Sequence, residues 1–182
     1  GGSNSGGTGG PNIDPTPVPI PLGTPVPIVR TLPLPASMDS GGIVLSESGM
    51  LYVPTAQGVV LAYTEAGDLD WEVDLGTAIS TFPTLGSDGS LYLSGENGSV
   101  YALGSDGQMR WTFTPEEPNH FRLGGLALDE NGILYTGGTF ETLYALDSSD
   151  GSEVWRFKAR APLDNVPVVS GERVYVLALD QT

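Results

Sequence analysis

Three tryptophans recur at nearly equal spacing along the chain. Trp71, Trp111 and Trp155 lie 40 and 44 residues apart, and each ends the same pattern of sequence. The pattern opens with a Gly-x-Leu-Tyr stretch, passes through an apolar run with a central alanine, and reaches a turn glycine before the tryptophan. A fourth opening at 173–175 is not followed by a tryptophan. A period of about 40 residues constrains the fold strongly, because one such unit buries its apolar residues only against its neighbours.

Each repeat divides into four short apolar runs separated by turn residues. Asp88-Gly89 and Asn97-Gly98 are examples of pairs that supply the positive φ angles of tight hairpins. No helical periodicity is present, so the repeats predict an all-β fold. Specifically, they predict a β-propeller of four-stranded antiparallel blades, with about three and a half blades in this chain. The strands are expected at 43–45, 50–54, 59–63 and 69–73, at 82–85, 90–93, 99–103 and 109–113, and at 125–128, 133–136, 142–146 and 154–157.

The repeated tryptophans and alanines have a mechanical interpretation. An indole on the outermost strand is expected to fill the gap between adjacent blades, with its N–H reaching a backbone carbonyl of the next unit. A stack of tryptophans can also bind sugars or quinones, but recurrence once per blade favours packing. The central alanines are expected where blades approach closely and a larger side chain does not fit. These alanines are Ala62, Ala102 and Ala145.

Two stretches carry a resemblance to a known family. Residues 98–111 and 142–155, each running from a Tyr-Ala-Leu strand through an Asp-Gly turn to tryptophan, resemble the repeat of quinoprotein-type propellers. That superfamily includes the pyrroloquinoline-quinone dehydrogenases and non-enzymatic envelope lipoproteins. The resemblance covers residues 42–182 and excludes the N-terminal segment. In this family the tryptophan motif is structural, so the resemblance implies the fold and no particular chemistry.

The sequence offers little support for an active site. Enzymatic members of the family hold their quinone over calcium and many place a cysteine pair against it, whereas this chain has no cysteine. Asp88, Asp106 and Asp129 occupy hairpin turns, where they serve backbone geometry, and 129–132 holds only a fragment of a calcium loop. His120 is the single histidine and has no nucleophile near it in sequence. We therefore expect no enzyme, no cofactor and no metal.

The first 35 residues differ from the repeats. Residues 1–10 are a flexible Gly/Ser-rich leader, and 11–35 carry proline at short intervals and predict an extended polyproline II arm. Apolar residues alternate with those prolines, so the arm is expected to pack on another chain or a lipid-proximal surface, or else to act as a spacer. Leaders of this kind often follow the lipid-bearing cysteine of bacterial lipoproteins, which predicts a membrane tether through a lipidated N-terminus. The propeller domain is expected over 36–182.

The chain carries a formal charge of −15, almost all of it in the repeats. Such a surface repels nucleic acid and anionic membranes, which leaves proteins, cations or neutral polymers as partners. The alternative is that the acidity serves only to keep an extracellular protein soluble. Arg156, Lys158 and Arg160 alternate along the end of the third repeat and form either a docking stripe or an edge-protecting row of charges. His120 and Arg122 belong to an insertion at 115–122, which together with the linker at 159–165 varies most between repeats. These five residues are the candidate interaction residues.

Three and a half blades do not close a ring of 4–8 blades. The chain is therefore expected to be part of a longer one, to assemble with further copies, or to be capped by another subunit. The function hypothesis is a non-catalytic scaffold for protein–protein interaction in the periplasm, at the outer membrane or on the surface of a bacterium. The alternative is a fragment of a quinone-dependent oxidoreductase whose cofactor site lies in other blades.

Overall fold

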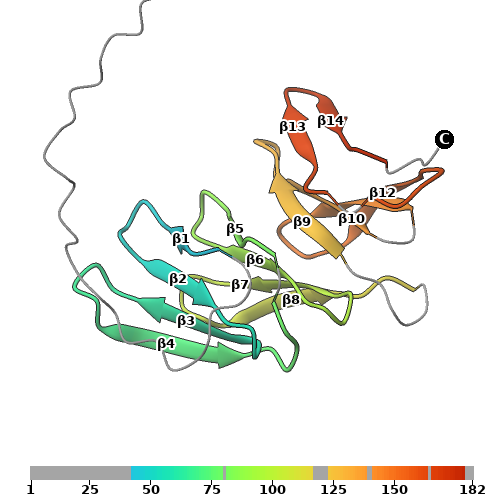
Figure 1. Cartoon of the computed structure of the whole chain (residues 1–182). Coiled ribbons are helices and arrows are strands. Elements are labelled where there is room, and N and C mark those ends of the chain that lie inside the picture. The colour runs from blue at the N-terminus through green and yellow to red at the C-terminus, as the bar shows by residue number, and fades with distance from the viewer. Residues whose placement is uncertain (1–41, 80, 117–122, 139–140, 164, 179–182) are drawn as a thin grey trace, which may run out of the picture. The chain divides into compact units, whose positions relative to one another are not determined.

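The computed structural model describes residues 42–79, 81–116, 123–138, 141–163 and 165–178. The chain divides into two units, residues 1–31 and 32–182, and all the described residues belong to the second. The leader and most of the arm form the first unit, so their predicted conformation lies outside the described residues. The described part contains 14 strands (Figure 1). It contains no helix long and apolar enough to cross a membrane.

The strands form three four-stranded antiparallel sheets and one two-stranded sheet, each in simple sequence order. This confirms the all-β prediction of successive four-stranded blades. The first sheet contains β1 (Val44–Leu45), β2 (Leu51–Pro54), β3 (Val59–Tyr63) and β4 (Leu69–Asp74). The second contains β5 (Thr84–Leu85), β6 (Leu91–Ser94), β7 (Val100–Leu103) and β8 (Met109–Phe113). The third contains β9 (Leu123–Leu128), β10 (Ile133–Gly138), β11 (Thr142–Asp147) and β12 (Glu153–Lys158), and β13 (Val168–Ser170) pairs with β14 (Arg173–Tyr175).

The innermost strands of the first two sheets are shorter than the sequence predicts. The strand expected from Phe82 begins at Thr84, because Pro83 has no N–H to donate to a ladder. Phe82 itself is 69% exposed. In the third sheet the strands are longer than predicted, and β10 and β12 each extend beyond the expected ends.

The same three-residue row crosses the middle of every four-stranded sheet. Tyr52 pairs with Ala62, which pairs in turn with Trp71. The rings of Tyr52 and Trp71 contact each other with their centroids 5.7 Å apart and their planes tilted by 40°. Sheets two and three repeat the row with ring centroids 5.8 Å apart, as Tyr92, Ala102 and Trp111 and as Tyr135, Ala145 and Trp155. Ala62 and Ala102 are also buried in the hydrophobic clusters that join their sheets to the next one, and the close approach of blades at these alanines stays a prediction.

A register shift follows the alanine in each of these rows. It lies between Ala62 and Tyr63, between Ala102 and Leu103, and between Ala145 and Leu146. A β-bulge of this kind adds a residue to the outermost strand and increases its local twist. The irregularity therefore belongs to the repeat itself, and it precedes each tryptophan.

Each tryptophan of the first two sheets bonds to the sheet that follows. The Trp71 Nε1–H donates to the Ser105 carbonyl, and the Trp111 Nε1–H donates to the Ser148 carbonyl, both at 2.9 Å. The indoles lie flat against turn glycines, since a Cβ at Gly107 would be 2.7 Å from Trp71 and one at Gly151 would be 2.5 Å from Trp111. These are the carbonyl contacts that the sequence predicts for the indole N–H groups.

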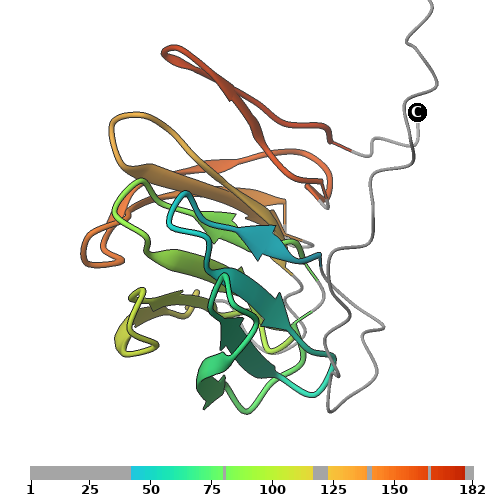
Figure 2. The same cartoon turned by 90° about the vertical axis from the view of Figure 1, so that its left-hand side faces the viewer.

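The core runs from sheet to sheet along the same contacts. One cluster joins the first and second sheets, with Val60, Ile79 and Leu91 among its fully buried members. A second joins the second and third sheets around Val100, Leu134 and Leu146. A hydrogen bond also joins the second and third sheets, in which the Thr84 hydroxyl donates to the Leu126 carbonyl at 2.9 Å. The view turned by 90° shows the four sheets following one another (Figure 2). Trp155, by contrast, remains 40% exposed in the described part of the chain.

Candidate protein-docking surface

One end of the sheets is built from tight turns that all carry negative charge. In an antiparallel sheet, the turn after the first strand and the turn after the third lie at the same end. Each of the seven described turns at this end holds at least one Asp or Glu, and none holds Lys or Arg. We call this end the acidic turn face. Its turns are 46–49, 64–67, 86–89, 104–107, 129–132, 147–151 and 170–172.

Short-range hydrogen bonds hold these turns in shape. Asp88 Oδ1 accepts the Ser90 N–H at 3.0 Å, and Asp106 Oδ1 accepts the Gln108 N–H at 3.1 Å. Asp129 Oδ1 accepts the N–H groups of Asn131 and Ile133, both at 2.8 Å. The sequence prediction that these aspartates serve hairpin geometry is confirmed. The carboxylates are thereby fixed in direction while remaining at the surface.

The same bonds keep the turn carboxylates ionised. Hydrogen bonds from the backbone and hydroxyl of Ser90 hold the pKa of the Asp88 carboxyl below its usual value. The hydroxyl and backbone of Ser152 lower the pKa of Asp150 in the same way. A hydrogen bond to the charged form favours that form. The acidic turn face therefore keeps these charges at any pH well above 4.

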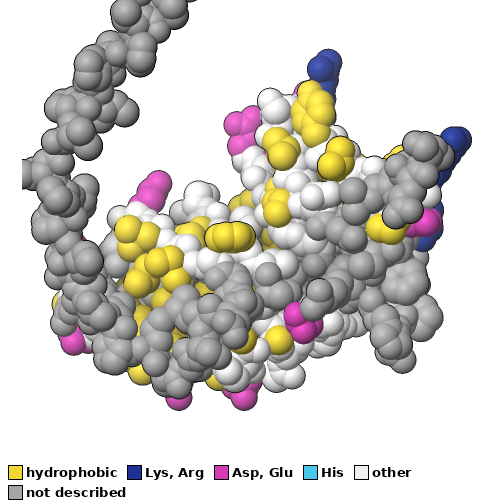
Figure 3. Space-filling view, viewed as in Figure 1, with side chains coloured by type: hydrophobic (Ala, Val, Ile, Leu, Met, Phe, Trp, Pro, Cys, Tyr) yellow, Lys and Arg dark blue, Asp and Glu magenta, His cyan; other side chains and the backbone are white. Residues whose placement is uncertain are grey.

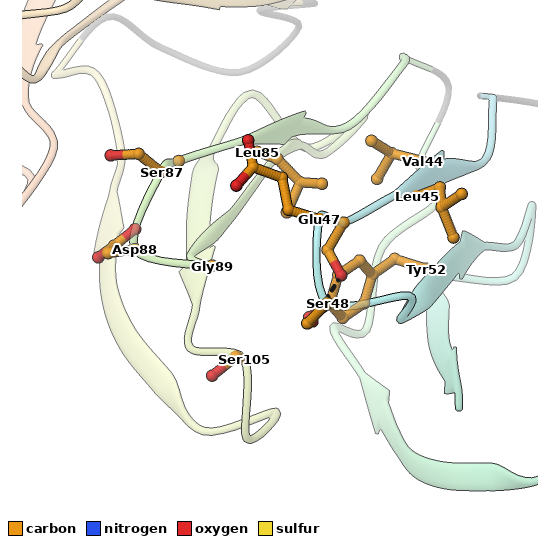
Figure 4. A pocket seen from close by; sticks show the side chains of 12 residues that line it. Val44, Leu45, Glu47, Ser48, Tyr52, Leu85, Ser87, Asp88, Gly89 and Ser105 are labelled. Atoms are coloured by element: carbon orange, nitrogen blue, oxygen red, sulfur yellow. Dashed lines mark hydrogen bonds between the residues drawn. The ribbon is translucent and has the colours of Figure 1, made fainter. Parts of the chain in front are cut away.

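A groove opens on this face between the first two sheets. Its volume is about 690 Å³, and it lies between β1 with its turn and the turn that follows β5. Val44, Leu45 and Leu85 supply apolar surface, and Glu47 and Asp88 supply charge. Figure 4 shows Val44 and Leu45 on one side and Ser87 and Asp88 on the other, with Glu47 and Leu85 between them.

A second groove of about 570 Å³ repeats this arrangement between the second and third sheets. The turn 86–89 contributes to both grooves. In the second groove Leu85 takes the place of Leu45, and Leu128 with Glu130 takes the place of Leu85 with Ser87. Both grooves are therefore products of the repeat. The tryptophan contacts to Ser105 and Ser148 hold their walls, because both serines also line these grooves.

The floor of the first groove is a continuation of the core. Tyr52 is 1% exposed and lines the groove beneath Leu45. Burial raises the pKa of the Tyr52 phenol, and Asp70 adds to the effect. Leu45 itself is 65% exposed, so its side chain is available to a ligand. In the space-filling view, hydrophobic side chains gather over β1 and its surroundings (Figure 3).

The basic residues that the sequence singled out lie elsewhere. Arg156 and Lys158 share one face of β12, where Arg156 Nε bonds to Glu153 Oε1 at 2.8 Å and Lys158 Nζ to Thr142 Oγ1 at 3.3 Å. The hydrogen bond and charge of Glu153 raise the pKa of Arg156. Arg160 follows β12 and is exposed. His120 and Arg122 lie outside the described residues. The structure thus places three of the five candidate interaction residues on or beside one strand.

Sequence reasoning did not identify the acidic turn face as a surface. Each carboxylate was interpreted singly, as a turn residue. The usable signal was its recurrence, because an Asp or Glu returns in the corresponding turn of every repeat and no described turn of this face holds Lys or Arg. A cation reaches the face from a strand, since Arg110 of β8 pairs with Asp106 at 3.2 Å. The apolar half of the groove gave no such signal, since Leu45 and Leu85 are ordinary strand residues in sequence.

The described residues provide no group of ligands for a metal ion that could hold a quinone. Among them, no three Asp, Glu or His side chains lie close enough together to hold a metal ion. The segment 129–132 is a hydrogen-bonded turn, in which Asp129 Oδ2 accepts the Tyr135 hydroxyl at 3.0 Å. Burial and that bond raise the pKa of Tyr135 to about 12.

Comparison with known proteins identifies the repeat. A family model described as outer membrane protein assembly factor BamB matches residues 26–123 and again residues 96–182. The chain belongs to this family. The overlap of the two matches reflects the internal repeat, and the family's PQQ-like propeller repeat agrees with the resemblance seen in the sequence. No curated protein matches the sequence.

Solved structures support the same fold. BamB from Moraxella catarrhalis is 19% identical with a TM-score of 0.65, over 76% of this chain and 43% of its own. The computationally designed Ika4 protein is 15% identical with a TM-score of 0.61, over 81% of this chain and 92% of its own. The quinohemoprotein alcohol dehydrogenase of Comamonas testosteroni is 17% identical with a TM-score of 0.57, over 67% of this chain and 21% of its own. The chain therefore spans less than half the length of the Moraxella BamB.

Proposed function

We propose that the chain acts as a non-catalytic scaffold that binds other protein subunits in a cell-envelope assembly. Membership of the BamB family carries this proposal, because that family's description is outer membrane protein assembly. The proposed location is the periplasm, the outer membrane or the cell surface. The N-terminal segment is the proposed tether, through a lipidated N-terminus.

The repeating contacts support a scaffold role for the sheets. Trp71 and Trp111 each fasten one sheet to the turn of the next through an indole hydrogen bond and a ring lying on glycine. We propose that these tryptophans act as inter-blade plugs and that Trp155 has the same role. Sheets joined in this way present their turns in fixed relative positions. A preorganised surface binds a partner at a lower entropic cost than a mobile one.

The test is isolation of the tagged full-length protein from the envelope of its host. We expect it to be recovered with a reproducible set of envelope proteins in fixed stoichiometry, and to fractionate with the membrane. If the protein is recovered from both the membrane and the soluble fractions without any co-purifying protein, the scaffold proposal is overturned. A Trp111→Ala variant gives a matched comparison, since loosened sheets are expected to retain less of the partner set.

A quinone-dependent oxidoreductase is the second candidate function. The likeness to the Comamonas quinohemoprotein alcohol dehydrogenase favours it, although this shows a shared fold only. Addition of pyrroloquinoline quinone with calcium separates the two candidates. Stoichiometric appearance of the cofactor's absorbance on the protein supports the oxidoreductase. Unchanged free-cofactor spectra at micromolar protein support the scaffold.

A further inference from the structure

The two grooves of the acidic turn face combine apolar surface with unpaired charge. Glu47 in the first groove and Glu130 in the second have no hydrogen-bond or ion-pair partner in the described part of the chain. Their carboxylates therefore have no role in holding the turns. Beside them lie Leu45, which is 65% exposed, and Leu128, which is partly buried. A ligand that places an apolar group beside a cation complements both features.

The grooves also follow one another. They share the turn 86–89, so a ligand that fills both must cross Ser87 and Asp88. Each volume lies in the range that accepts several side chains or a small molecule. Two such grooves in adjoining positions suit an extended polymer better than one compact molecule. The uniform negative charge of the turns excludes a nucleic acid as that polymer.

We propose that these grooves bind an extended, basic segment of a partner polypeptide. Apolar side chains of that segment contact Leu45, Leu85 and Leu128, and its Lys or Arg side chains lie beside Glu47, Asp88 and Glu130. This inference rests on the proposed scaffold function and names the chemistry of one partner segment. It places that segment at the opposite end of the strands from the linker that holds Arg160. Complementary charge also accelerates association and makes it sensitive to salt.

The test uses the full-length protein and synthetic peptides of twelve residues carrying a fluorophore. One peptide alternates lysine with leucine, a second replaces its lysines by glutamate, and a third replaces its leucines by serine. Fluorescence anisotropy at 50 mM and 200 mM salt gives the dissociation constants. We expect the Lys/Leu peptide to bind, and to bind more weakly at the higher salt. The glutamate peptide is expected not to bind, and the serine peptide to bind at least about tenfold more weakly.

Charge variants distinguish the grooves from general attraction to an acidic protein. Glu47→Gln with Glu130→Gln removes two carboxylates from the grooves, and we expect it to weaken the Lys/Leu peptide about tenfold. Glu72→Gln with Glu116→Gln removes the same charge from exposed positions outside the grooves and is expected to change affinity less than twofold. Equal weakening by both pairs, or no weakening by the first, overturns the inference.

An apolar variant tests the other half of the site. Leu45→Ser is expected to leave the unfolding curve nearly unchanged, because the side chain is largely exposed, and to weaken the peptide several-fold. If Leu45→Ser instead lowers the mass of the protein in solution and leaves peptide affinity intact, the groove holds a second copy and the inference is wrong. Failure here leaves the scaffold proposal standing, provided that the host still yields the partner set. Loss of that partner set is the separate failure of the scaffold proposal.

Discussion

The indole of Trp111 lies on Gly151 of the next sheet and donates a hydrogen bond to the Ser148 carbonyl at 2.9 Å. Trp71 repeats the relationship with Gly107 and Ser105. The turn glycine is thus needed for two reasons, since its φ is positive and a Cβ would collide with the indole. This contact links the repeat of the sequence to the stacking of the sheets.

Trp111→Ala should therefore lower the free energy of unfolding by about 3–5 kcal/mol, because a largely buried indole is removed and a cavity remains. Trp111→Phe keeps a ring and loses the hydrogen bond, so a smaller loss is expected. Trp155→Ala is the matched comparison, and it should cost less because Trp155 is 40% exposed. Urea unfolding followed by circular dichroism gives all three values. A Trp111→Ala variant as stable as the wild-type protein would contradict the packing role.

Gly151→Ala should destabilise by about 2–4 kcal/mol, combining a left-handed alanine with overpacking against Trp111. Gly76→Ala separates the two causes. Gly76 also has a positive φ, of 68°, but nothing lies within 4 Å of its added Cβ. It should lose only about 1–2 kcal/mol. The difference between the two variants, measured by denaturant unfolding, reports the indole contact, and a zero difference would argue against it.

Glu141 is the one described non-glycine residue with a positive φ, of 63°. Gly58 and Gly98 hold the corresponding turn position in the first two sheets. Glu141→Gly should raise stability by about 0.5–1 kcal/mol, since relief of the left-handed backbone exceeds the entropy lost with glycine. Glu141→Ala should bring no gain. An unfolding midpoint that falls in the glycine variant would contradict this prediction.

Tyr135 should make stability decline at alkaline pH. Its folded pKa is about 12, whereas a free phenol titrates near 10. Between these values the unfolded state releases the proton and the folded state retains it, so stability falls as pH rises from 10 to 12. Asp129→Asn removes the charge that the phenol faces and should lower that pKa. Ultraviolet titration of the phenolate gives the shift, and a titration near 10 in the wild-type protein would refute it.

The four-stranded blades could be predicted from the sequence because the same order of apolar runs and turn residues recurs in every repeat. Alternation, Asp-Gly turns and one tryptophan per repeat placed the third and fourth strands of each blade closely. The innermost strands were harder, since Pro83 shortens β5 in a way that apolar content alone does not reveal. The tyrosine and alanine of each row recur visibly in the sequence. Their contact with the tryptophan depends on the register of strand pairing, which the sequence alone does not specify.

The docking surface could not be derived in the same way. Arg156, Lys158 and Arg160 were evident because cations are rare in this chain. The acidic turn face escaped notice because aspartate in a turn already has a structural explanation, which the hydrogen bonds of Asp88 and Asp129 confirm. The groove arises only when β1 and β5 lie beside each other. That adjacency joins residues about 40 positions apart, as Leu45 and Leu85 are.

Site-specific photo-crosslinking in the host cell tests the scaffold account most directly. A photoreactive residue replaces Ser87, on the turn shared by the two grooves, or Arg160, at the opposite end of the strands, in the full-length protein. The account predicts covalent adducts of reproducible mass with envelope proteins, with the Ser87 adduct reduced by added Lys/Leu peptide. Illumination that yields no adduct from either position, in cells where the protein is folded and abundant, would contradict it.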